Sequence, residues 1–136
     1  MSIIKPTDSE LEILHILWEK GQATVRTVND LLNERRKSNR SAARQSAGYT
    51  TTLKLMQIMF EKGLVTREEE GRTHIYVAAV REQDTQSLLL QEFMDNAYRG
   101  SAARLVMQAL GNHEASADEL DEIKALIAQI EQQHPK

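Results

Sequence analysis

Polar and basic side chains recur at helical spacing in the segment 49–62. Thr50, Lys54, Gln57 and Glu61 follow one another at intervals of four, three and four residues, so a helix would place them on one face, with the acid in its last turn. Hydroxyl, ammonium and carboxamide groups hydrogen-bond to base edges in the major groove of DNA. The other side of the same segment carries residues that we expect to be buried: Thr52, Leu55, Met56, Met59 and Phe60. The pattern predicts a helix from Tyr49 to Lys62, ended by Gly63, with one face suited to nucleic acid.

This segment and its neighbours supply the candidate contacts to DNA. The predicted base-edge contacts are Thr50, Thr51, Lys54 and Gln57. Free backbone amides near the helix start, around the two threonines, would also favour a phosphate. The predicted backbone contacts are Arg40, Arg44, Tyr49, Arg67, Arg72 and His74.

The charge distribution agrees with a polyanion partner for one part of the chain. Residues 1–80 hold 12 Lys and Arg against 10 Asp and Glu, whereas residues 81–136 hold 5 against 10. From Arg35 to Phe60 there are six basic residues and no acid. Such a local basic footprint favours nucleic acid. Alternatively, Arg35–Lys37 only complement the dipole at the end of a helix.

The elements that position these residues can be predicted in the first 80 residues. Thr7 and Glu10 fit a capping box that begins a helix, which Gly21 would end as a left-handed cap. A second helix begins at Thr24 and runs to about residue 36, and a basic polar loop covers 37–47. After Gly63 the period changes to two, which predicts strands over 64–67 and 72–77 around an acidic, solvated turn at 68–71. Three helices and a hairpin predict a winged helix-turn-helix domain, 1–80.

The remainder, 81–136, is predicted to be a helical dimerisation domain. Helices are expected over 83–98, around Leu105, and after Ser116, which begins a second capping box. Their apolar residues occupy more faces than a single small chain can cover, so we expect an interface between two copies. Its predicted residues are Leu88, Leu89, Phe93, Leu105, Val106, Leu110, Ile123, Leu126, Ile127 and Ile130. The fold class is therefore mostly α with a small β-hairpin. Its large aromatic residues Trp18, Phe60 and Phe93 are expected in the core.

Several short strings occur together in order. They are Pro6-Thr7, Glu10-Leu11-Glu12-Ile13-Leu14, Leu17-Trp18, Ala23-Thr24-Val25, Gly48-Tyr49-Thr50-Thr51-Thr52-Leu53, Glu61-Lys62-Gly63-Leu64-Val65 and Gly71-Arg72-Thr73-His74-Ile75-Tyr76. With these strings the chain resembles the penicillinase repressor family, which includes the methicillin-resistance repressors, closely over 5–80 and loosely beyond. The resemblance implies a homodimeric transcriptional repressor with an N-terminal winged helix, a C-terminal helical dimerisation domain and an operator of dyad symmetry.

The resemblance also implies a membrane sensor protease that cleaves the repressor. Family members released in this way carry Asn-Phe where this chain has Gln108-Ala109, which argues against release by cleavage here. Copper-responsive relatives bind metal through C-terminal cysteines, and this chain has no cysteine. The stretch 38–46 also looks longer than the usual link before the third helix.

Other classes of function have less support. No phosphate-binding glycine loop, nucleophile elbow or zinc-protease motif occurs, so we expect no enzyme and no cofactor. His15, His74, His113 and His134 lack the spacing of metal ligands, so no metal site is expected. No secretory signal or membrane span is visible, and we expect a cytoplasmic protein. Two alternatives stay open: a winged-helix adaptor that binds protein without specific DNA binding, and a regulator that senses a small molecule.

Overall fold

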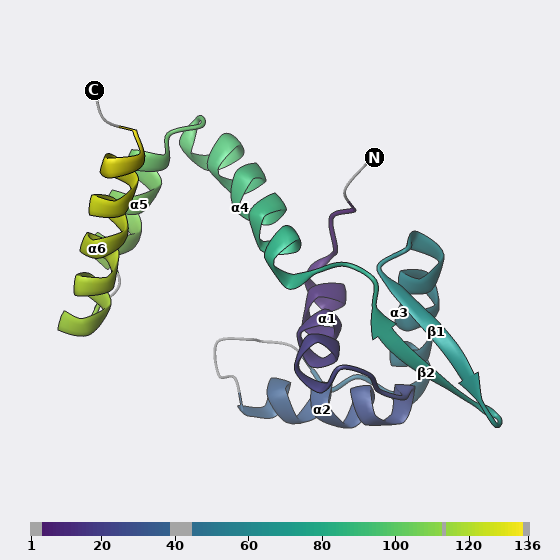
Figure 1. Cartoon of the computed structure of the whole chain (residues 1–136). Helices are drawn as coiled ribbons and strands as arrows, with labels where there is room; N and C mark the ends of the chain where they lie inside the picture. The colour runs from purple at the N-terminus through teal and green to yellow at the C-terminus, as the bar shows by residue number, and fades with distance from the viewer. Residues whose placement is uncertain (1–3, 39–44, 113, 135–136) are drawn as a thin grey trace. The chain divides into compact units, whose positions relative to one another are not determined.

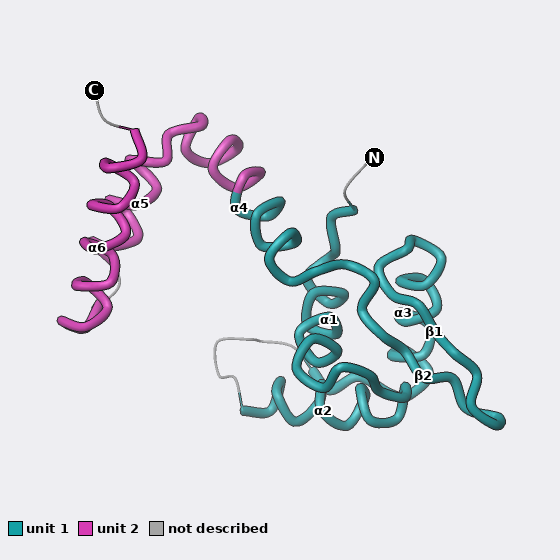
Figure 2. Tube along the Cα trace, viewed as in Figure 1, with its two compact units in different colours: residues 1–90 teal, residues 91–136 magenta. Residues whose placement is uncertain are grey.

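The computed structural model describes residues 4–38, 45–112 and 114–134. Its elements are α1 (Asp8–Lys20), α2 (Val25–Ser38), α3 (Tyr49–Lys62), β1 (Val65–Glu70), β2 (Thr73–Ala78), α4 (Glu82–Tyr98), α5 (Ala102–Asn112) and α6 (Ala117–Gln133) (Figure 1). The chain forms two compact units, residues 1–90 and 91–136 (Figure 2). The first unit contains three helices followed by a hairpin, which is the predicted winged helix. The domain boundary predicted after residue 80 stays a prediction.

Caps fix both ends of α1. The Thr7 hydroxyl accepts a hydrogen bond from the Glu10 amide, and the Glu10 carboxylate accepts one from the Thr7 amide, which confirms the capping box. Gly21 follows the helix with φ +84° and ψ −45°, so φ is positive but the residue lies outside the left-handed helical region that we predicted. The turn still needs glycine, because side chains disfavour positive φ.

The core of the first unit lies where the three helices meet the hairpin. Its buried apolar residues are Ile13, Leu14, Ile16, Leu17, Ala23, Val25, Val28, Leu32, Met56, Met59, Leu64, Val65 and Tyr76. Trp18 packs against this core half-buried, and its indole Nε1 donates to the Val80 carbonyl at 2.9 Å. This bond joins α1 to the segment that follows the hairpin.

The wing is longer than its sequence pattern indicated. β1 and β2 pair antiparallel from Val65 opposite Ala78 to Glu70 opposite Thr73. Only Gly71, with φ +66°, and Arg72 connect them, so Glu68–Glu70 are strand residues and our prediction of a turn at 68–71 was wrong. A two-residue turn keeps the last pair in register, and acidic side chains can occupy a strand that solvent reaches. The hairpin tip projects beyond the helices of this unit (Figure 1).

The hairpin is also joined to the link between α1 and α2. Ala23 and Tyr76 exchange two backbone hydrogen bonds, with Ala23 N to Tyr76 O at 3.0 Å and Tyr76 N to Ala23 O at 2.8 Å. Because Tyr76 is also buried, β2 is held to the helical core at its middle. The wing therefore starts from a fixed base.

The second unit leaves much apolar surface exposed. Neither α5 nor α6 has a buried residue. Phe93 is 54% exposed, with Tyr98 edge-on at 5.7 Å between ring centroids, so our expectation that Phe93 is a core residue is wrong for the single chain. Too few side chains surround it, because a piece of this size cannot enclose every large residue. None of the described helices is both long and apolar enough to cross a membrane.

Candidate nucleic-acid interface

The helix α3 has two distinct faces, and its bounds are those predicted. Thr52, Met56 and Met59 are fully buried against the core. The four predicted base-edge residues, Thr50, Thr51, Lys54 and Gln57, are all exposed. The buried face therefore fixes the helix. The exposed face presents polar groups and one ammonium group outward, together with Ile58 and, in the last turn, the Glu61 carboxylate.

Two residues of the predicted inner face are not fully buried: Leu55 is half-buried and Phe60 is exposed. Phe60 is 38% exposed, and the guanidinium carbon of Arg67 lies 4.0 Å from the centre of its ring. Arg67 is opposite the buried Tyr76 in the hairpin register, so both side chains project from the face of the hairpin that packs on the helices. Phe60 lies at the edge of the core, and a cation from the wing covers it in place of an apolar side chain.

The start of α3 is held by two asparagines that the sequence analysis missed. The Asn33 carboxamide accepts from the Ala47 amide at 2.6 Å and donates to the Ala47 carbonyl at 2.8 Å. Asn29 Nδ2 donates to the same carbonyl at 3.0 Å and to Thr52 Oγ1 at 2.7 Å. The link into α3 is thus attached to α2 just before the helix begins.

Part of the basic segment is used inside the fold. Arg36 binds Glu12 through Nε at 3.1 Å and Nη2 at 2.9 Å, and its Nη1 donates to the Gln45 carbonyl at 3.1 Å. Arg35 pairs with Glu19. Both acids lie on α1, outside the acid-free segment from Arg35 to Phe60. They neutralise part of its positive charge, so fewer of its basic side chains are available to a partner than the sequence indicates. Arg40 and Arg44 lie outside the described residues.

The far end of α3 is held by an ion pair with a buried acid. Glu10 is only 1% exposed, and Lys62 Nζ lies 2.8 and 3.1 Å from its two carboxylate oxygens. Burial raises the pKa of Glu10, but hydrogen bonds from Lys62 and Thr7 outweigh it and hold the pKa below its ordinary value of 4.5. The carboxylate that caps α1 therefore also fixes the last turn of α3.

The wing carries both charge signs. Arg72 lies exposed in the two-residue turn at the tip. His74 stands opposite Glu69, with Nε2 3.8 Å from the carboxylate, an ion pair that forms only when the imidazole is protonated. Of the predicted wing contacts, Arg72 is thus free to meet a phosphate, whereas Arg67 and His74 already have neighbours within the fold.

A further basic residue lies near the start of α3. Arg26 is exposed in the first turn of α2, and its guanidinium carbon lies 5.7 Å from the centre of the Tyr49 ring. Tyr49, predicted as a backbone contact, is itself exposed at 47%. The sequence analysis missed Arg26 because it lies outside the basic window, and only folding brings the first turns of α2 and α3 together.

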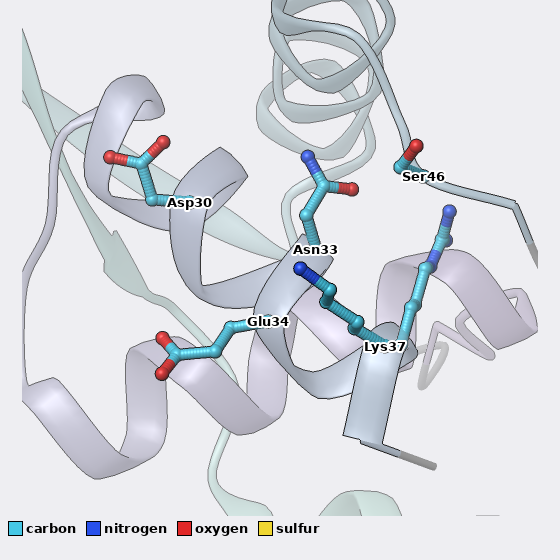
Figure 3. Close-up of a pocket in the computed structure, with 6 residues that line it drawn as sticks. Asp30, Asn33, Glu34, Lys37 and Ser46 are labelled. Carbon is cyan, nitrogen blue, oxygen red and sulfur yellow. The ribbon is translucent and has the colours of Figure 1, made fainter. Parts of the chain in front are cut away.

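A surface depression of about 570 Å³ lies beside the link into α3. Its lining comes from α2 and from the link itself: Asp30, Asn33, Glu34, Arg36, Lys37 and Ser46. The Asn33 side chain lies on the side of α2 toward the segment with Ser46, whereas the Glu34 carboxylate points away from it (Figure 3). Among the described residues, no group of three or more His, Cys, Asp or Glu side chains could hold a metal ion.

Comparisons with known proteins place the chain in a family. A family model described as penicillinase repressor matches residues 6–129. The chain is 23% identical to the penicillinase repressor of Bacillus licheniformis over 122 aligned residues. The alignment covers 89% of this chain and 88% of that protein. It is 21% identical to the methicillin resistance regulatory protein MecI of Mammaliicoccus sciuri over 121 aligned residues. That alignment covers 89% of this chain and 91% of that protein.

A solved structure is also similar. The solution structure of the DNA binding domain of the repressor BlaI aligns with a TM-score of 0.49 and 20% identity, over 61% of this chain and 90% of that one. The family model spans both units of the chain, from the cap of α1 into α6. This chain belongs to the penicillinase repressor family.

Proposed function

We propose that this protein is a homodimeric transcriptional repressor that binds a pseudo-palindromic DNA operator. The observation that carries the proposal is the exposed polar side of α3, opposite the fully buried Thr52, Met56 and Met59. Membership of a repressor family supports it, and so does similarity to proteins named as a penicillinase repressor and a methicillin resistance regulatory protein. In this proposal the protein binds DNA without catalysing a reaction, and it does so in the cytoplasm.

In the proposed complex, α3 enters the major groove. Thr50, Thr51, Lys54 and Gln57 face base edges, because these side chains are exposed and end in groups that hydrogen-bond to bases. Arg72 meets the flanking backbone from the wing tip, and Arg26 and Tyr49 meet it beside the start of α3. Arg40, Arg44, Arg67 and His74 remain proposed backbone contacts.

The second unit and α4 supply the proposed dimer interface. Phe93, Val106, Leu110, Leu126, Ile127 and Ile130 are exposed, and Leu88, Leu89, Leu105 and Ile123 are half-buried. Burying about 1,000 Å² of such surface contributes about 25 kcal/mol before the costs of association. A twin chain would cover these side chains and present two copies of α3 about one or two helical turns of DNA apart.

The proposal is tested by selecting bound sequences from a random duplex pool with the full chain, followed by gel shifts at two salt concentrations. We expect a selected site with dyad symmetry that binds more tightly than random duplex. Absence of DNA binding even at low salt would contradict the proposal and favour the alternative, a protein-binding adaptor.

Release by proteolysis is not part of the proposal. Gln108 and Ala109 lie exposed on α5, where a protease could reach them, but they differ from the Asn-Phe pair of cleaved family members. We therefore do not propose a membrane sensor protease as a partner.

A further inference from the structure

The connection between α2 and α3 is long for a helix-turn-helix. A turn of about three or four residues usually joins the two helices, and its shortness fixes the angle between them. Here residues 39–48 separate Ser38, the end of α2, from Tyr49, the start of α3. A link of this length leaves the place of α3 relative to α2 to be set by other contacts.

The asparagines of α2 provide such contacts. A carboxamide carries both an acceptor and donors, so it can pair with the carbonyl and the amide of one residue as a neighbouring strand would. Asn33 does this with Ala47, through bonds of 2.8 and 2.6 Å. Asn29 adds a bond of 3.0 Å to the same carbonyl, so two turns of α2 hold one residue of the link.

The attachment continues into α3 itself. Asn29 also donates to Thr52 Oγ1 at 2.7 Å, and Thr52 is fully buried in the first turn of α3. The Thr52 amide donates to Gly48 O at 3.1 Å, the first hydrogen bond of the helix, and Gly48 has no side chain to cap it. The start of α3 is therefore tied to α2 on both sides of its first residue.

We propose that Asn29 and Asn33 are positioning residues that set the place of α3 against α2, so that sequence-specific DNA binding depends on them although they do not contact base edges. The inference rests on the proposed function of α3. Groups that bind a ligand must be held within about 0.5 Å of the productive geometry. Loss of the attachment moves Thr50 and Thr51 relative to the rest of the domain, while the basic residues still attract any duplex.

The test compares Asn29→Ala, Asn33→Ala and the double variant with the full wild-type chain. Gln22→Ala, which removes an exposed carboxamide from the link between α1 and α2, is the matched control. The probes are a duplex selected by the wild type from a random pool and a random duplex of equal length. Affinities are measured at a temperature well below the thermal unfolding midpoint of every variant, so that only folded protein is compared.

We expect the double variant to lose about tenfold or more of its preference for the selected duplex, as for a mismatched base pair. Its affinity for random duplex should stay within about threefold of the wild type. A preference that survives in the double variant overturns the proposal, even if the unfolding midpoint falls. If the double variant does not fold, the same comparison of selected and random duplex is made with Asn29→Ala, which keeps both bonds from Asn33 to Ala47. A preference that survives in Asn29→Ala then overturns the proposal.

Hydrogen exchange of the Ala47 amide separates this proposal from the proposed function. It is measured on free protein, where Asn33 Oδ1 accepts that amide. We expect faster exchange in Asn33→Ala and wild-type exchange in Gln22→Ala. Equal rates overturn the attachment itself, whereas a wild type without preference for any duplex contradicts the proposed function.

Discussion

Lys54 lies near the middle of the exposed face of α3, between Thr50 and Gln57. An ammonium group there can donate to a guanine edge or contact a phosphate, and the two cases differ in their effect on specificity. Because the side chains around it are short, Lys54 is the longest group that this face projects.

The first prediction concerns Lys54→Ala. We expect a loss of about 1–3 kcal/mol in binding to the selected duplex, with relaxed choice at one base position. Gel shifts against duplexes changed at each position measure it. Lys20→Ala, at the exposed end of α1, is the control and should bind as the wild type does. Equal weakening on every sequence would instead assign Lys54 to the DNA backbone.

Lys62 matters for stability because it pairs with the buried Glu10. The second prediction is that Lys62→Met destabilises the fold by about 1–3 kcal/mol at neutral pH, since a buried carboxylate loses a charged donor. Urea unfolding measures the change. Glu10→Gln combined with Lys62→Met should recover part of it, because the remaining amide carries no charge. A Lys62→Met variant as stable as the wild type would show that the pair contributes little.

The same pair predicts the pH dependence of stability. The folded-state pKa of Glu10 lies below its ordinary value of 4.5, so its contribution is present above 4.5 and is lost as pH falls through the folded-state pKa. In Lys62→Met burial acts without the lysine, so protonation of Glu10 should favour the folded state. Unfolding midpoints between about pH 6 and pH 3 should therefore fall less steeply in the variant than in the wild type.

At the scale of elements, the wing carries side chains that would attract DNA phosphates and side chains that would repel them. Arg72 occupies its two-residue turn, while Glu68–Glu70 line the adjacent strand and are exposed. The proposed phosphate contact is therefore confined to the tip and to the side chains at the α3 side of the hairpin.

The third prediction is that Arg72→Ala lowers the slope of log affinity against log salt by about one. One phosphate contact releases about one counterion, and the effect should be the same for selected and random duplexes. Arg104→Ala, exposed on α5, should leave the slope unchanged. An unchanged slope in Arg72→Ala would remove the wing tip from the contact surface.

The stack of Arg67 on Phe60 joins the wing to α3. The fourth prediction is a coupling of about 0.5–1 kcal/mol between these side chains in the free energy of unfolding. A double-mutant cycle with Arg67→Ala and Phe60→Leu measures it. Arg67→Lys should behave more like Arg67→Ala than like the wild type, because an ammonium group does not stack on a ring as a planar guanidinium does. Additive effects in the cycle would show that the two side chains are merely adjacent.

At the scale of the whole molecule, α6 carries an apolar stripe without a buried residue. The fifth prediction is that Ile127→Asp with Ile130→Asp lowers the mass seen by light scattering from that of a dimer to that of one chain. Affinity for the full selected site should fall, because two linked recognition helices bind far more tightly than one. Ala125→Asp, on the opposite side of α6, should stay dimeric. A wild type that is a monomer at micromolar concentration would contradict the proposed assembly.

Much of the fold could be predicted because its signals are local. Glycines and caps mark the ends of α1 and α3, and the change of period after Gly63 marks the wing. The exposed face of α3 followed from spacing alone. The predictions failed at Phe60 and Phe93, because hydrophobicity does not tell which large residue lies at the edge of a core.

Contacts between residues distant in the chain could not be predicted. Nothing near Asn33 or Asn29 indicates Ala47 as a partner, and nothing near Arg36 indicates Glu12. The order of residues along α2 and α3 was enough to propose a groove-facing helix, but it gave no sign of the asparagine side chains that attach the start of that helix to α2.

The amino-acid sequence by itself determined the helices, the hairpin, the winged-helix class and which side of α3 faces outward, because caps, turns and hydrophobic periodicity act over a few residues. Only the tertiary structure decided which charges remain free, which aromatic rings are covered, and how α3 is attached to α2. These depend on side chains that meet only after the chain has folded, and pairing between distant residues leaves no local pattern.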